Sequence, residues 1–162
     1  MALGESARRI VVLDTSDLAH PRVIAGFDPG FPAHDLRFAP GGRRVWITSS
    51  SGDAVAVIGA DDRRRLFDVP GGAPPQHVAF AGDRAYVTSG YGSRIEAVSA
   101  GTGRILKVAT APYGSFDLAA ADGLVATASL LRGTLTVYDD RLRVLHSVQV
   151  ASAARDVALS GP

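Results

Sequence analysis

The sequence predicts an all-β fold, a β-propeller built from four-stranded antiparallel blades, and three observations support this prediction. Corresponding residues recur at intervals of 40, as at Ser49, Ser89 and Ser129. Each interval holds four short apolar runs, separated by Gly, Pro, Asp and Ser residues that favour turns. No stretch has the periodicity of an amphipathic helix. Four strands in about 40 residues is the period of a propeller blade, whereas β-helix repeats are much shorter.

The first element is an incomplete blade. Residues 8–14 (RRIVVLD) and 22–27 (RVIAGF) predict two β-strands on either side of a turn. A rigid loop follows, because Pro29 and Pro32 fix the backbone angle φ and remove hydrogen-bond donors. We expect a partial blade over residues 8–31, in which the two strands are the third and the outer strand.

Three complete blades are expected next, and each begins with a short innermost strand, continues through a hairpin and ends with an outer strand. The blades span residues 32–73, 74–114 and 115–154. Residues 155–162 start a further blade, with an innermost strand at 156–159. Trp46 and Tyr86 occupy equivalent hairpin positions and are expected to pack between blades. The chain is thus predicted to be a single domain of about four blades, three complete and two partial, forming an open arc or a fragment of a larger ring.

Three phrases of the sequence carry a resemblance to a known family. Residues 85–89 (AYVTS) resemble the signature of the YVTN-type (YncE-like) propeller repeats. Residues 38–48 (FAPGGRRVWIT) are similar to that family's Ser-Pro-Asp-Gly turn and the strand that follows it, and residues 53–58 (DAVAVI) resemble its next strand. Gly41 and Gly59 stand where the family usually has Asp, and the third hairpin lacks the full phrase.

The resemblance implies a ring larger than this chain alone can build. Such repeats usually close into seven-bladed rings, which need roughly 280 residues at this period. We therefore expect the chain to be about half of a larger propeller, or one of two copies that complete a ring. Self-association through open blade edges is expected, because exposed apolar faces drive association.

Composition excludes several classes of function. The net charge is +1, so no global field attracts nucleic acid or an acidic membrane surface. The chain has no cysteine, which excludes disulfides, thiolate metal sites and thiol nucleophiles. No apolar run approaches the roughly 20 residues that span a bilayer. The first residues lack the apolar stretch of a signal peptide. The compartment stays open: cytoplasmic as written, or extracytoplasmic if an upstream segment is missing.

The repeat brings one set of residues to the mouth of the channel. In a propeller of this type, the loops that enter the innermost strands and the hairpin tips share one face. We expect a ligand site there, formed by His34, Asp35, Gln76, His77, Tyr91, Phe116, Asp117, Arg155 and Asp156. Within this set, the residues that start successive innermost strands form a ring: Asp35, His77, Asp117 and Asp156.

Two interpretations of this ring stay open. Asp35, His77 and Asp117 have the side chains of a divalent-cation or general acid–base site. Alternatively, the same residues cap strands and bond loop backbones, since buried polar groups need partners in any repeat fold. We predict no cofactor.

Three functions are compatible with these observations. The favoured one is a non-catalytic binding or scaffold module that offers its loop face to a protein or a small ligand. No Ser/His/Asp triad, phosphate loop or HExxH motif indicates catalysis. The resemblance implies a second function, a lactonase-like hydrolase or lyase with a central metal ion. The third is a truncated propeller without independent activity.

Overall fold

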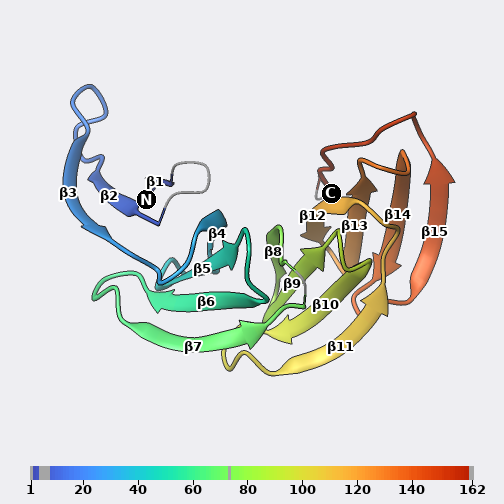
Figure 1. Cartoon of the computed structure of the whole chain (residues 1–162), viewed down its shortest axis with the longest axis horizontal. Coiled ribbons are helices and arrows are strands. Elements are labelled where there is room, and N and C mark those ends of the chain that lie inside the picture. Colours follow the sequence, from blue (N-terminus) through green and yellow to red (C-terminus); the bar gives the residue numbers. More distant parts are fainter. Residues whose placement is uncertain (1, 4–7, 73, 161–162) are drawn as a thin grey trace.

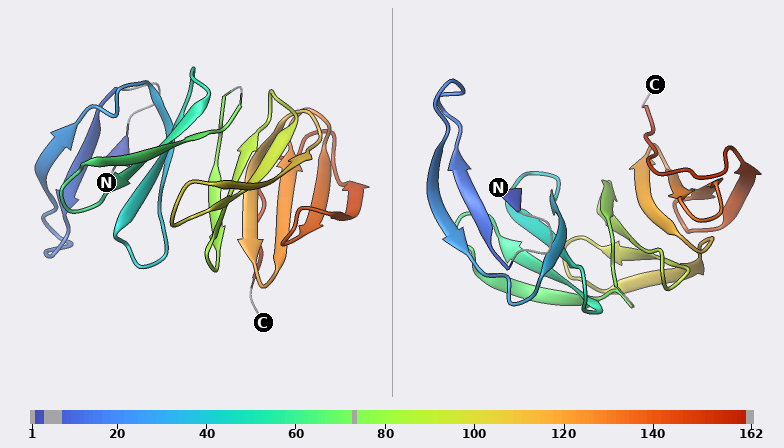
Figure 2. Two further views of the ribbon diagram at one scale, coloured as in Figure 1. Left: turned by 90° about the horizontal axis from the view of Figure 1, so that it is seen from below. Right: turned by 45° about the horizontal axis from the view of Figure 1, so that its top comes forward.

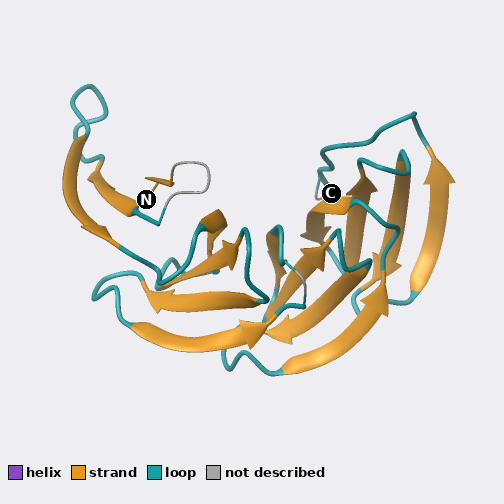
Figure 3. Ribbon diagram, in the orientation of Figure 1, coloured by secondary structure: helices purple, strands orange, loops and turns teal. Residues whose placement is uncertain are grey.

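Fifteen β-strands and no helix make up the part of the chain that the structure describes (Figure 3). The structure is a computed structural model, and it describes residues 2–3, 8–72 and 74–160. The first three strands form one antiparallel sheet, which we call the N-terminal sheet: β1 (Ala2–Leu3), β2 (Ile10–Asp14) and β3 (Arg22–Phe27). No helix in these residues is long and apolar enough to cross a membrane.

Three four-stranded antiparallel sheets follow, each built from four consecutive strands. Blade I consists of β4 (Ala33–Phe38), β5 (Arg44–Ser49), β6 (Ala54–Gly59) and β7 (Arg65–Pro70). Blade II consists of β8 (Val78–Ala81), β9 (Arg84–Ser89), β10 (Arg94–Ser99) and β11 (Ile105–Thr110). Blade III consists of β12 (Ser115–Ala121), β13 (Leu124–Ser129), β14 (Thr134–Asp139) and β15 (Val144–Gln149).

The blades stand side by side in an open arc (Figure 1). The first strands of the blades, β4, β8 and β12, lie on the inner side of the arc, and the last strands, β7, β11 and β15, lie on its outer side. A second view shows the same opening between the N-terminal sheet and the C-terminal end (Figure 2). The predicted all-β partial propeller with three complete blades is confirmed.

All four sheets share one irregularity, which identifies the strands of the N-terminal sheet. In the three blades, the pairing of the third strand with the outer strand shifts register at intervals of 40, at Val57/Ile58, Ala97/Val98 and Val137/Tyr138. In the N-terminal sheet, the pairing of β2 with β3 also shifts register late in the first strand of the pair, at Val12/Leu13. The strands β2 and β3 are therefore the third and outer strands of a blade, as the sequence predicts. Because β1 pairs with β2, it takes the place of a second strand.

The core consists of three apolar layers, one between each pair of neighbouring sheets. The layer between the N-terminal sheet and blade I contains Ile10, Val45, Ile47 and Ile58. The layer between blades I and II contains Trp46, Val55, Val57, Val87 and Val98. The layer between blades II and III contains Tyr86, Ile95, Leu118, Val125 and Tyr138. The predicted packing of Trp46 and Tyr86 between blades is thus confirmed.

A repeated threonine ties the backbone of each blade to the next one. Thr48 Oγ1 accepts a hydrogen bond from Asp35 N at 2.9 Å and donates one to the Gln76 carbonyl at 2.9 Å. Thr88, 40 residues later, donates in the same way to the Phe116 carbonyl at 2.8 Å. One hydroxyl therefore links two neighbouring innermost strands near their N-terminal ends.

A repeated arginine ties the blades together at the opposite end of the second strand. Arg44 donates to the carbonyl oxygens of Ala100 and Gly101 at 3.0 and 2.8 Å. Arg84 reaches Asp140 of blade III in the same way, with its Nη1 3.1 Å from the Asp140 carboxylate. The sequence analysis did not identify these two arginines as links between blades.

Blade III lacks both links. At intervals of 40, Leu124 stands where Arg44 and Arg84 stand, and Ala128 stands where Thr48 and Thr88 stand. The face of blade III that points away from blade II therefore lacks the side chains that link the other blades.

Two strand predictions near the ends need correction. The sequence predicts the first strand at residue 8, but residues 2–3 form a short additional strand, β1. An innermost strand is predicted at 156–159, but residues 151–160 are not in a strand. A β-strand needs a neighbouring strand for its backbone groups, and none of the described strands pairs with this segment. The last two residues of the predicted further blade, 161–162, lie outside the described part of the chain.

Candidate functional site

The predicted site residues surround one pocket on the inner side of the arc. This mouth pocket has a volume of about 240 Å³ and is lined by His34, Gln76, His77, Tyr91, Phe116, Asp117, Leu130, Arg155 and Asp156. Eight of the nine predicted residues line it. The ninth, Asp35, is outside the lining, but its carboxylate lies 3.3 Å from Nδ1 of His77. Leu130 is the additional residue. Their convergence follows from the repeat, but their role in binding stays a prediction.

A histidine between two carboxylates forms the polar wall of the mouth pocket. His77 Nδ1 lies 3.3 Å from Asp35 Oδ2 and 3.9 Å from Asp117 Oδ1, so one residue from each blade meets here. The Nδ1 atom is buried and is not aligned for a hydrogen bond with either carboxylate, which makes both contacts electrostatic. The ring of His34 stands edge-on to that of His77, with centroids 5.3 Å apart.

Charge neighbours control the ionisation of Asp35. Burial acts to raise its pKa, but the contacts with His77 and Arg37 outweigh burial and hold the pKa of Asp35 below its ordinary value. Arg37 contributes an ion pair at 3.2 Å. Asp35 is therefore a carboxylate at neutral pH, and it presents negative charge to His77.

The described residues contain no group of three or more His, Asp or Glu side chains with the arrangement of a metal site. The side chains with metal-binding chemistry that the sequence brings together are those of Asp35, His77 and Asp117. Their two carboxylates approach the same imidazole nitrogen, which is the arrangement of ion pairing rather than of three donors around one cation. The cluster by itself gives no support to the metal-dependent alternative.

Aromatic rings form the opposite wall of the mouth pocket. The ring of Tyr91 lies 4.9 Å from that of Phe116 and 6.5 Å from that of Tyr113, measured between centroids. Tyr91 lies at the tip of the hairpin between β9 and β10 and is 57% exposed. Gly90 allows this packing, because a Cβ atom there would lie 2.3 Å from Cδ1 of Phe116. The sequence analysis missed Tyr113, which follows a proline in the loop before β12.

Residues 151–160, the C-terminal segment, form the third side of the mouth pocket. The exposed side chains of Arg155 and Asp156 line the pocket there. Hydrogen bonds from the backbone of residues 154 and 157 are among those that hold this segment against blade III. Val157 N donates to Asp117 Oδ2 at 2.9 Å, and Ala154 N donates to the Ser129 carbonyl at 3.2 Å. Asp117 therefore has two roles, one toward His77 and one toward the C-terminal segment.

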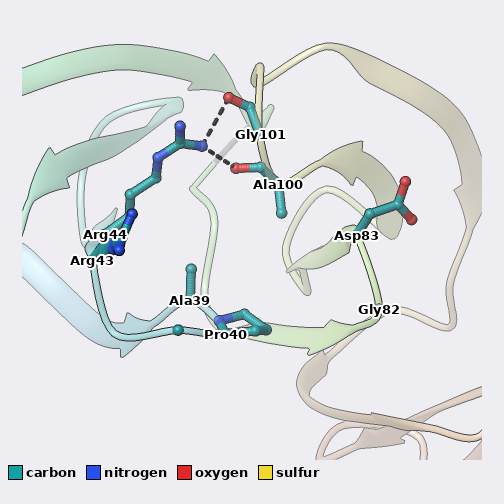
Figure 4. Close-up of a pocket in the computed structure, with 9 residues that line it drawn as sticks. Ala39, Pro40, Arg43, Arg44, Gly82, Asp83, Ala100 and Gly101 are labelled. Carbon is teal, nitrogen blue, oxygen red and sulfur yellow. Dashed lines mark hydrogen bonds between the residues drawn. The ribbon is translucent and has the colours of Figure 1, made fainter.

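Other surface features do not have the character of a ligand site. A pocket of about 550 Å³ between blades I and II contains Arg43, Arg44 and Asp83, but Arg44 is already bonded to two backbone carbonyls of blade II (Figure 4). The basic run at 63–65 is exposed to solvent. The mouth pocket remains the candidate site.

Comparisons with known proteins establish the fold alone. No family model matches the chain, and no curated protein matches its sequence. Solved structures do match it. A chain of the mitotic checkpoint complex has a TM-score of 0.74 and 12% identity over 91% of this chain and 46% of that chain. The RRP9 WD40 repeats have a TM-score of 0.69 and 13% identity over 78% of this chain and 42% of that chain.

A designed protein, Ika4, has a TM-score of 0.66 and 17% identity, and the alignment covers 82% of this chain and 81% of that chain. The chain thus spans less than half the length of the first two proteins and most of the length of the third. At such low identities a shared fold does not transfer function. The fold and these similarities define a β-propeller repeat protein.

Proposed function

We propose that this chain is a propeller binding module of the YVTN type, and that its mouth pocket takes a basic side chain of a protein partner. The observation that carries the proposal is the composition of the pocket walls. The Tyr91 and Phe116 rings stand on one side, and the carboxylates of Asp117 and Asp156 line the same pocket. No comparison supplies the partner.

The charge balance of the mouth pocket favours a cation. Two carboxylates, Asp117 and Asp156, line it against one guanidinium, that of Arg155. A third carboxylate, that of Asp35, lies 3.3 Å from Nδ1 of His77. A guanidinium or ammonium group near aromatic faces gains roughly 0.5–2 kcal/mol from the cation–π interaction. An arginine or lysine side chain would combine both contacts, because its stem packs on the rings while its charged end meets the carboxylates.

Titration with a single amino-acid probe tests this proposal. We expect N-acetylarginine amide to shift the NMR signals of Tyr91, Phe116 and His77, with a dissociation constant on the order of 1 mM for one side chain. N-acetylcitrulline amide has the same shape without the charge, and it should shift these signals much less. Tyr91→Ala should weaken arginine binding several-fold.

Phe38→Ala is the matched control, since it removes another exposed ring, from the far end of β4, and should leave binding unchanged. Equal shifts with the charged and the neutral probe would contradict the cation assignment. Shifts that Tyr91→Ala does not alter would contradict the use of this pocket.

A further inference from the structure

The N-terminal sheet has three strands in the described residues, whereas every blade has four. The shared register shift identifies β2 and β3 as the third and outer strands, so β1 is the second strand, and none of the described strands occupies the innermost position. The free edge of β1 therefore presents backbone N–H and C=O groups. Such an edge is a template for an added strand.

The C-terminal segment has the sequence of an innermost strand but no strand to pair with. Residues 155–159 (RDVAL) match residues 76–80 (QHVAF) and 116–120 (FDLAA) at the same repeat position. Val157 and Leu159 are half-buried and alternate with exposed neighbours, the period-two pattern of a strand. The bond from Val157 N to Asp117 holds the segment beside β12, where the next innermost strand would stand.

The two ends of the arc also carry apolar faces that the repeat buries elsewhere. On blade III, Leu135 occupies the position of Val55 and Ile95, which are fully buried between blades. Leu135 is half-buried, and its cross-strand partner Val148 is 40% exposed. On the N-terminal sheet, Leu13 pairs with Val23, which is 62% exposed. Each end of the arc thus lacks a neighbouring blade.

We propose that a second copy of this chain completes both ends. Residues 155–159 of each copy add to the edge of β1 in the other copy as the missing innermost strand. One strand from the first copy and three from the second make a composite four-stranded blade. Each copy then contributes three complete blades and one composite blade, and doubling this number gives a closed ring of eight. Asp156 enters the ring of polar residues at the channel mouth.

A second copy is a suitable partner because residues 155–159 have the sequence of the innermost strand that the described N-terminal sheet lacks. Closure within one chain would require the N-terminal sheet to meet blade III, and these stand at opposite ends of the arc (Figures 1 and 2). The contact is head-to-tail, and such contacts form closed rings when the rotation between copies allows closure.

The molar mass of the full chain in solution tests the proposal. We expect a single species of twice the chain mass of 16.8 kDa at about 100 µM, a concentration that populates complexes of micromolar affinity. Hydrogen exchange should show protected amides in residues 157–159 and in β1. Ala158→Pro and Val157→Lys should each lower the mass to that of one chain and remove this protection, because proline and a buried charge oppose strand addition.

Ser152→Pro is the matched control, since it places proline in the same tail before the segment and should keep the dimer. Residues 155–159 are in no strand of their own chain, so both test variants should keep the circular dichroism of the unchanged chain. A one-chain mass at this concentration, a mass above two chains, or a dimer that neither variant dissociates would each overturn the proposal.

Discussion

Replacing Thr88 by valine should loosen the connection between blades II and III. Thr88 is fully buried, and its hydroxyl donates to the Phe116 carbonyl at 2.8 Å and accepts a longer bond from His77 N at 3.4 Å. Valine has nearly the same shape, so no cavity forms and the change isolates the hydrogen bonds. Leaving a buried carbonyl without its donor costs about 1–3 kcal/mol.

Urea unfolding measures this loss as a lower transition midpoint with an unchanged slope. In a chain of this length, each kcal/mol corresponds to roughly 3 °C in the thermal midpoint. Thr102→Val is the matched control, because Thr102 lies in an exposed turn and its hydroxyl takes part only in a 3.4 Å contact. If Thr88→Val were no more destabilising than this control, the hydroxyl link between blades would be refuted.

Four further predictions concern the mouth pocket and the buried carboxyl groups. Gly90→Ala should destabilise the chain by about 1–3 kcal/mol and weaken probe binding, because the added methyl group displaces the Phe116 ring. Burial raises the pKa of the Glu96 carboxyl group, although the neighbouring Arg94 acts to lower it. The contribution of Glu96 to stability is therefore complete below the ordinary pKa of 4.5, and it is lost as the pH rises through the folded-state pKa of Glu96. Contacts lower the pKa of Asp35, so its contribution is complete above 3.8 and is lost as pH falls through its folded-state pKa. Calcium or a chelator should not change the melting temperature, since a cation bound by the native state would raise it.

Gly101→Ala is the control for Gly90→Ala, because a Cβ atom at residue 101 would have only one neighbour, at 4.0 Å. Unfolding free energies measured across pH for Glu96→Gln and Asp35→Asn should differ from those of the unchanged chain with opposite slopes. Slopes of the same sign would contradict the assigned environments. A calcium-dependent rise in melting temperature would revive the metal-site interpretation.

Much of the fold was predictable because its signals are local. The strand β3 (Arg22–Phe27) lies at the residues that the sequence predicts for it, and the hairpins recur at intervals of 40 residues. The candidate site followed from the same repeat, since residues at equivalent positions of successive blades meet at one end of the arc. Sequence reasoning therefore brought His77 and Asp117 together correctly.

The missed features depend on partners distant in the sequence. The strand β1 exists because Leu3 pairs with Ile10, and the two-residue strand has no pattern of its own. Residues 156–159 have the right pattern but no backbone partner, so they do not form a strand. The role of Arg84 depends on the turn at Asp140, which is 56 residues away.

By itself, the sequence determined the period, the order of the strands and the set of residues at the mouth, because alternation and turn chemistry are properties of neighbouring residues. Only the tertiary structure decided that Asp35 and Asp117 approach the same nitrogen of His77, and that Phe116 packs on Gly90. Among the described residues, it also left one edge of β1 and residues 155–159 without a paired strand. These outcomes depend on how successive blades are placed, and that placement is set by packing between sheets rather than within them.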